Sequence, residues 1–199
     1  MKRKIIWLIV ALLMFIAGVA TVRLRKSYSP PHATDSALTK NFSDHQADFN
    51  ILVKMANEDS RVRIIESSFV GLDNKDGWPP SIYLHENEAW PRSEAELGFT
   101  KQQWDKYRSL FQKLNLESGM KRKHDMPDAI FFTASMDFSE MDEAEAAVTE
   151  KGYVYSPKGI YYSLTGTLDG IEINRPAIFF EKLNDNWYLY YEWSVSKPE

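Results

Sequence analysis

The chain has 199 residues, of which 44% are hydrophobic and 26% are charged, a composition typical of a folded globular protein. Cysteine is absent, which excludes disulfide scaffolds, cysteine nucleophiles, thiolate zinc sites and iron–sulfur clusters. The formal net charge of −4 disfavours a generally basic nucleic-acid-binding protein. These properties bound the class of protein without naming a ligand or a reaction.

The N-terminus differs from the rest of the chain. Residues 5–22 form an apolar run without a charge, and basic residues flank it within 2–4 and 23–26. As a helix rising ~1.5 Å per residue, the run spans ~27 Å, close to the ~30 Å hydrocarbon core of a bilayer. We therefore expect residues 1–26 to form a cytoplasmic stub and a transmembrane signal-anchor. A cleaved signal peptide is the alternative, because residues 18–20 are small enough for a cleavage site.

The distribution of charge indicates an orientation. Three basic side chains flank each end of the run, and the terminal amine favours a cytoplasmic N-terminus. Residues 1–26 hold six of the 24 basic residues and none of the 28 acidic ones, so the rest carries 18 minus 28, or −10. Anionic lipid headgroups and nucleic acid repel such an acidic body. The expected location is the bacterial inner membrane, with one pass through residues 5–22, a periplasmic C-terminal domain and no nucleic-acid partner.

Residues 27–40 are small and polar and include two adjacent prolines, as is typical of a linker. Residues 41–199 are then expected to form one extracytoplasmic domain. Its first helix is predicted to start near Ser43, because Ser43 and Gln46 fit a capping box and apolar residues follow at helical spacing. The prolines and the capping box together predict an extended tether before a helical start.

A second helix is predicted after Thr100, where Thr100 and Gln103 form another capping box. Its apolar face is formed by Trp104, Tyr107, Phe111 and Leu114. Gly119 follows shortly afterwards and is expected to stop the helix.

The remaining pattern favours β-structure, because β-branched and aromatic residues gather in short runs. The candidate strands are residues 62–70, 81–85, 129–135, 153–156, 160–164, 177–183 and 187–195. Residues 184–186 are Asn-Asp-Asn, which predicts a hairpin turn, and the strand after it is aromatic on both faces, as a central strand is. The expected fold is α+β, with an N-terminal transmembrane helix followed by a single domain of two main helices packed on an antiparallel sheet.

Residues 71–99 lack a clean period and are expected to form a long loop with one short strand. Trp78, Tyr83, His85 and Trp90 lie in this segment without a burial pattern, next to prolines that restrict the chain. Because aromatic residues often dominate binding energy, we predict that these four bind a ligand or a partner. The alternative is a lid over the core.

Motifs of catalysis are absent from the sequence. It has no G-x-S-x-G elbow and no complete zinc-protease helix, so we predict no catalytic residue, no metal site and no cofactor. The basic residues within 120–124 are expected to lie in an exposed loop. Glu181 and Glu192 lie in the two arms of one predicted hairpin, where paired carboxylates would permit glycosidase chemistry. Two acidic groups are interpreted as solvated charge, namely His124, Asp125 and Asp128, and Asp137, Glu140 and Asp142.

Four segments carry a resemblance to a known group of proteins: FNILVKMANED, LGFTKQQWDKYRSLFQKLNLESG, KGYVYSPKG and NDNWYLYYEW. The chain resembles small bacterial envelope proteins of uncharacterised activity, in which a W-x-x-Y-R-x-L-F helix precedes K-G-Y-x-Y-S-P and a final W-Y-L-x-Y-E strand. The matching residues here are Trp104, Tyr107, Arg108, Leu110 and Phe111, then residues 151–157 and 187–192. The resemblance covers most of residues 41–193, implies an exported, membrane-attached body, and supplies no activity.

Two functional hypotheses follow. The first is a non-enzymatic, membrane-tethered extracytoplasmic binding module for a protein or an envelope component; an immunity-type protein that blocks a toxin belongs to this class. The second is an envelope hydrolase that acts on glycan or peptide through paired carboxylates. A deep cleft with two carboxyl groups of raised pKa would favour the hydrolase, and a shallow aromatic or acidic face would favour the binding module.

Overall fold

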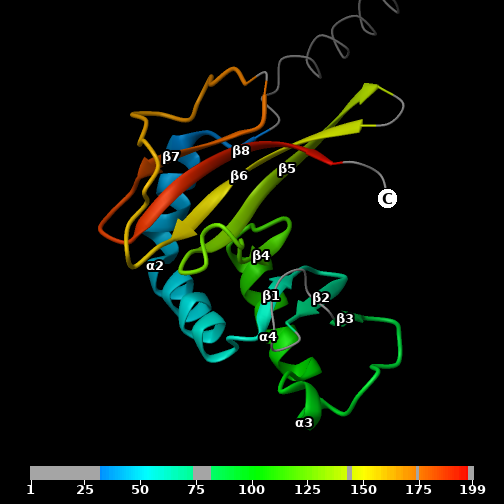
Figure 1. Cartoon of the computed structure of the whole chain (residues 1–199). Helices are drawn as coiled ribbons and strands as arrows, with labels where there is room; N and C mark the ends of the chain where they lie inside the picture. Colours follow the sequence, from blue (N-terminus) through cyan, green and yellow to red (C-terminus); the bar gives the residue numbers. More distant parts are fainter. Residues whose placement is uncertain (1–31, 74–81, 143–144, 174, 197–199) are drawn as a thin grey trace, which may run out of the picture. The chain divides into compact units, whose positions relative to one another are not determined.

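The computed structural model describes residues 32–73, 82–142, 145–173 and 175–196 (Figure 1). The described residues all belong to one compact unit, which begins at His32. The predicted membrane-spanning run and Trp78 therefore lie outside the described residues. Within those residues, no helix combines the length and the apolar character needed to cross a bilayer.

The first described helix, α2, spans Asp35–Glu58 and begins earlier than predicted. Thr34 caps it by accepting a hydrogen bond from the Ala37 amide, so the end of the predicted linker is helical and the predicted start near Ser43 is wrong. The residues of the predicted capping box, Ser43 to Gln46, lie at a kink instead, because His45 leaves the helical conformation with φ −128°. Its ring Nδ1 donates to the Asn41 carbonyl at 3.1 Å, which satisfies a carbonyl beside the kink.

The second predicted helix is confirmed as α4, Lys101–Lys113, with the capping box of Thr100 and Gln103 in place. A short helix that the sequence did not predict, α3, spans Glu94–Leu97 inside the expected long loop. Gly119 is not a helix stop. Asn115 adopts the left-handed conformation after α4, with φ 54°, and Gly119 opens a strand.

Eight strands form one sheet in the order β3-β2-β1-β4-β5-β6-β8-β7, and every neighbouring pair is antiparallel. They are β1 Val62–Ile65, β2 Phe69–Leu72, β3 Ile82–His85, β4 Gly119–Lys121, β5 Ile130–Asp142, β6 Glu145–Tyr155, β7 Ala177–Lys182 and β8 Trp187–Ser196. An antiparallel sheet with helices is the predicted α+β class.

Several strand predictions are confirmed and others are corrected. The hairpin of β7 and β8 has its turn where predicted, and β8 pairs with strands on both sides. Residues 62–70 form two strands rather than one, because Glu66 donates to the Phe69 carbonyl at 2.9 Å and closes a hairpin. Residues 160–164 form no strand, and Leu164 makes a single bridge to Phe180.

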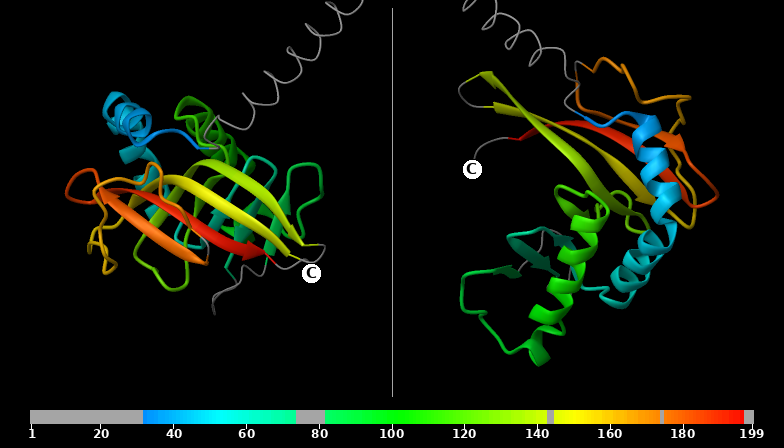
Figure 2. Two further views of the ribbon diagram at one scale, coloured as in Figure 1. Left: turned by 90° about the horizontal axis from the view of Figure 1, so that it is seen from above. Right: turned by 180° about the vertical axis from the view of Figure 1, so that it is seen from behind.

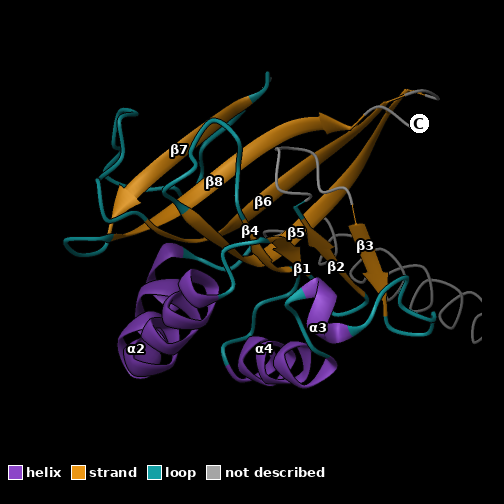
Figure 3. Cartoon of the chain, turned by 60° about the horizontal axis from the view of Figure 1, so that its bottom comes forward, coloured by secondary structure: helices purple, strands orange, loops and turns teal. Residues whose placement is uncertain are grey.

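Helices α2 and α4 cover one face of the sheet (Figure 3). The main core lies between them and the strands, where buried aromatic side chains contribute ~1.5–3 kcal/mol each. Its largest fully buried members include Phe49, Trp104, Tyr107, Phe132 and Tyr153. A second, smaller cluster lies on the opposite face around Phe131, Val154 and Tyr190. We call this opposite face, which no described helix covers, the open face.

A β-bulge shapes the centre of the sheet. β5 is irregular between Thr133 and Ser135, and beyond this point β5 and β6 continue as a long, twisted hairpin (Figure 2). Bulges increase the local twist of a strand. The bulge also presses the β5 backbone against Gly152 of β6, where no side chain would fit.

Candidate functional site

The open face carries charged side chains where a sheet normally has apolar or solvated ones. Lys121 of β4 pairs in register with Phe131 of β5, which pairs with Val154 of β6. Since paired residues share a face, Lys121 lies on the same side as the small apolar cluster. Glu150 of β6 lies directly opposite Glu192 of β8, and both belong to this face.

Two lysines bridge these two glutamates. Lys121 pairs with Glu150 and lies 3.8 Å from Glu192, and Lys123 pairs with Glu192. Like charges directly opposite across a strand pair are destabilising, so the lysines offset the repulsion between the glutamates. We call Lys121, Lys123, Glu150 and Glu192 the charged cluster. Lys123 also lies over an aromatic ring, with Nζ 4.7 Å from the centroid of Phe131.

Hydroxyl groups complete the hydrogen bonding of Glu150. Tyr190 donates to its Oε2 at 3.1 Å, and Thr133 lies 3.3 Å from the same oxygen. The two hydroxyls are 2.7 Å apart. Tyr190 is buried, so the hydrogen bonds fix the carboxylate of Glu150 in one position on the face.

The charges of the cluster shift one another's pKa values. Burial would raise the pKa of Glu150, but attraction and a hydrogen bond from Lys121 outweigh it, so the pKa lies below its usual value. Burial lowers the pKa of Lys123, and Glu192 opposes that effect. Glu66, which follows β1, has its pKa raised by burial and then by the neighbouring charge of Glu150. The face therefore combines an ionised carboxylate with a carboxyl group that binds a proton more readily.

A groove of about 390 Å³ opens beside the charged cluster. Its lining residues are Lys121, Arg122, Lys123, His124, Asp125, Glu192 and Ser194. The expectation that the basic residues of 120–124 lie in an exposed loop is therefore wrong. Lys121 belongs to β4, and Arg122 is buried with its guanidinium donating to the Ala56 carbonyl at 2.8 Å.

The aromatic residues predicted to bind a partner lie elsewhere. Tyr83 and His85 are exposed on strand β3, and both rings lie about 6 Å from the ring of Phe69 on β2. Trp90 is half-buried and packs against the core, with its ring 6.5 Å from that of Trp104. The structure therefore brings Tyr83 and His85 together beside Phe69. Trp90 partly covers the core, as the alternative lid hypothesis expects. That these residues bind a ligand or a partner stays a prediction.

Replacing Trp90 by Ala is expected to lower the thermal midpoint less than replacing Trp104 does. Trp104 is only 2% exposed and donates to the Glu66 carbonyl at 2.9 Å, so its loss creates a cavity costing ~3–5 kcal/mol. Thermal unfolding of both variants, followed by a measurement of partner capture, tests whether Trp90 contributes more to binding than to stability. Equal loss of the thermal midpoint in both variants would show that Trp90 is a lid and nothing more.

Glu181 and Glu192 are not placed to act as a catalytic pair of carboxylates. Glu181 pairs with Leu189 and Glu192 pairs with Ile178, so the two side chains point to opposite faces of the sheet. Of the predicted acidic groups, Asp128 is paired with Lys158 at 2.8 Å. Among residues 32–196, apart from the undescribed positions, no three acidic or histidine side chains are placed to hold a metal ion.

A second polar cluster ties the start of the described chain to the sheet. Lys151 is buried on the helix side, and its Nζ lies 2.7 Å from both Asp35 and Asp169. Asp35 also accepts hydrogen bonds from Thr167 and from the Leu168 amide, at 2.6 and 2.7 Å. We call Asp35, Lys151 and Asp169 the clasp.

Two further groups extend the clasp. His32 lies with one ring nitrogen 2.8 Å from the Ser135 hydroxyl and the other 2.8 Å from the Thr149 hydroxyl. Burial lowers the pKa of His32, which favours its neutral form. Burial, followed by repulsion from Asp35, raises the pKa of Glu181. The contacts around Asp35 serve to hold the N-terminal segment, since every partner is an element of the fold itself.

Comparison with known proteins adds no assignment. No protein-family model matches the chain, no curated protein matches it, and no solved structure matches it.

Proposed function

We propose that residues 32–199 form a non-enzymatic binding module, tethered to the membrane through residues 5–22, which recognises a protein or an envelope component on its open face. The observation that carries the proposal is the charged cluster. Half-buried ionic groups on a sheet face cost free energy of desolvation and add little to folding, so their place beside an open groove favours a role in recognition.

The shape of the site favours binding over catalysis. The groove is lined by polar and charged side chains, and the carboxylate of Glu192 in this lining is already paired with Lys123. A fixed pattern of charge of this kind supplies specificity and speeds encounter with a complementary partner. An immunity-type protein that blocks a toxin remains one member of this class.

A hydrolase that acts on glycan or peptide is the second candidate. One observation favours it, namely that the pKa of Glu66 is raised while that of Glu150 is lowered on the same face. Carboxyl groups with pKa values driven apart are the usual arrangement for an acid and a base. Release of soluble fragments from purified envelope by the full chain, abolished in Glu150→Gln, would support this candidate instead.

The proposal is tested with the full chain in its native membrane. Alkaline carbonate washing and protease digestion from the extracytoplasmic side first establish whether residues 5–22 anchor the protein and which side the body occupies. Photo-crosslinkers then replace Ser194 in the groove and, as a control, the exposed Lys54 on α2. We expect a discrete adduct from position 194 alone. Equal adducts from both positions, or none from 194, would overturn the proposal.

A further inference from the structure

We propose that the open face takes up a cationic group, a lysine or arginine side chain of a protein partner, at the carboxylate of Glu66. This inference rests on the proposed function and names the chemistry of the partner. It follows from the placement of Glu66, from the balance of charge on the face and from the charge of the whole body.

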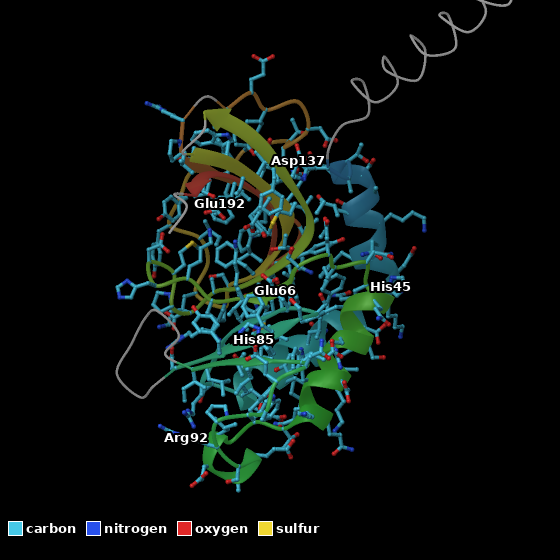
Figure 4. The ribbon with its side chains drawn as sticks, turned by 90° about the vertical axis from the view of Figure 1, so that its right-hand side faces the viewer. His45, Glu66, His85, Arg92, Asp137 and Glu192 are labelled. Atoms are coloured by element: carbon cyan, nitrogen blue, oxygen red, sulfur yellow. The ribbon has the colours of Figure 1, made fainter. Side chains whose placement is uncertain are left out.

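The placement of Glu66 follows from the strand register. Ile64 pairs with Lys121 and Ile65 with Met120, and Ile65 is fully buried in the core on the helix side. Because side chains alternate along a strand, Glu66 points to the open face with Ile64 and Lys121. Figure 4 labels Glu66 and Glu192 in the central part of the sheet.

Among Glu66 and the charged cluster there are three carboxylates and two lysines, which leaves one carboxylate over. Glu150 and Glu192 are paired with Lys121 and Lys123, whereas Glu66 has no ion pair or side-chain hydrogen bond with any other described residue. Lys121 attracts Glu66 but is already engaged with Glu150. A third cation is therefore what the face lacks, and a partner's ammonium or guanidinium supplies it.

The setting of Glu66 suits such a group. Its main chain is fixed by hydrogen bonds from the Trp104 indole at 2.9 Å and to the Phe69 carbonyl at 2.9 Å, so the backbone from which the side chain projects is held in place before binding. Half-burial strengthens its attraction to a cation compared with a fully exposed glutamate. The net charge of −10 after residue 26 also draws a basic partner towards the body as a whole.

The inference is tested on the full chain in nanodiscs of uncharged phosphatidylcholine. Isothermal titration calorimetry measures binding of tetra-arginine and of tetra-glutamate to the unaltered protein, to Glu66→Gln and to Glu58→Gln. Glu58 is the matched control, since it is an exposed acidic residue of α2 and its replacement removes the same charge. Thermal midpoints establish that both variants remain folded.

We expect tetra-arginine to bind the unaltered protein and Glu58→Gln alike, and Glu66→Gln to bind it about tenfold more weakly, which corresponds to ~1.4 kcal/mol. Tetra-glutamate is expected not to bind. Equal weakening in the two variants would show that only the overall charge matters and would overturn the inference. An adduct at position 194 would still support the proposed function in that case, so the two ideas fail separately.

Discussion

Replacing Gly152 by Ala is expected to prevent β5 and β6 from pairing as they do. A Cβ atom at this position would lie 2.1 Å from the Phe132 carbonyl oxygen and 2.9 Å from the Ala134 nitrogen. Both are backbone atoms next to the bulge, so no side-chain rotation can relieve the clash. Overpacking in a core costs ~1–3 kcal/mol and occasionally more, and this contact belongs at the upper end.

Urea unfolding of the full chain measures the effect, with Gly166→Ala as its control. A Cβ at Gly166 meets nothing within 4 Å, so that variant is expected to change stability by no more than ~0.5 kcal/mol. A Gly152→Ala protein as stable as the control would mean that the bulge relaxes freely. Gly152→Ala should also disrupt the charged cluster, because Thr133 and Glu150 flank the bulge on the two strands.

Replacing Lys151 by Met is expected to destabilise the protein by ~3–5 kcal/mol, because it leaves the buried charge of Asp35 without its cationic partner and also removes the partner of the more exposed Asp169. Lys158→Met is the matched control. Its ion pair with Asp128 is exposed to solvent, and surface pairs contribute little, so only a small change is expected. Urea unfolding near neutral pH compares the two variants.

The pH dependence provides a second test of Lys151→Met. Burial opposes ionisation of Asp35, but hydrogen bonds from Lys151, Thr167 and backbone amides lower its pKa from 3.8 to about 2. The stabilisation from Asp35 is therefore present above pH 3.8 and is lost as the pH falls towards about 2. Without Lys151 that pKa rises, so the stability gap between the variant and the unaltered protein should narrow on acidification. A gap that stays constant across this range would show that Lys151 acts through packing alone.

Glu181 affects the pH dependence of stability in the direction opposite to Asp35. Its pKa is raised, first by burial and then by Asp35, so its contribution is present below pH 4.5 and is lost as the pH rises through the raised value. Comparing the unaltered protein with Glu181→Gln separates this contribution from that of Asp35.

Local features of the fold were predictable from the sequence where the cause is itself local. The capping box at Thr100 fixes the start of α4 through hydrogen bonds between neighbours in sequence. The turn at residues 184–186 joins adjacent strands, and β8 is apolar on both faces because Trp187 packs in the main core and Tyr190 in the cluster on the open face. In each case a few consecutive residues determine the outcome.

The remaining features depend on contacts between distant segments. Strand β6 includes EAAVTE, whose alanines and glutamates favour a helix, and it becomes a strand because β5 and β8 pair with it on either side. The early start of α2 depends on Asp35 meeting Asp169 and Lys151. The charged cluster was missed because Lys123 and Glu192 lie far apart in sequence, and the only pattern pointing to it was the basic run within 120–124.

The clasp at Asp35 also limits the reach of the body. If residues 5–22 lie in the bilayer, as we propose, about ten residues separate them from His32, which is fixed to the sheet, and a fully extended chain of that length spans at most ~35 Å. A partner embedded in the same membrane would then meet the groove at a higher effective concentration than a partner that diffuses freely in solution. An intrinsic affinity too weak to hold a freely diffusing partner would then suffice for a membrane-bound neighbour, so on the proposed topology the short tether would itself select which partners the body engages.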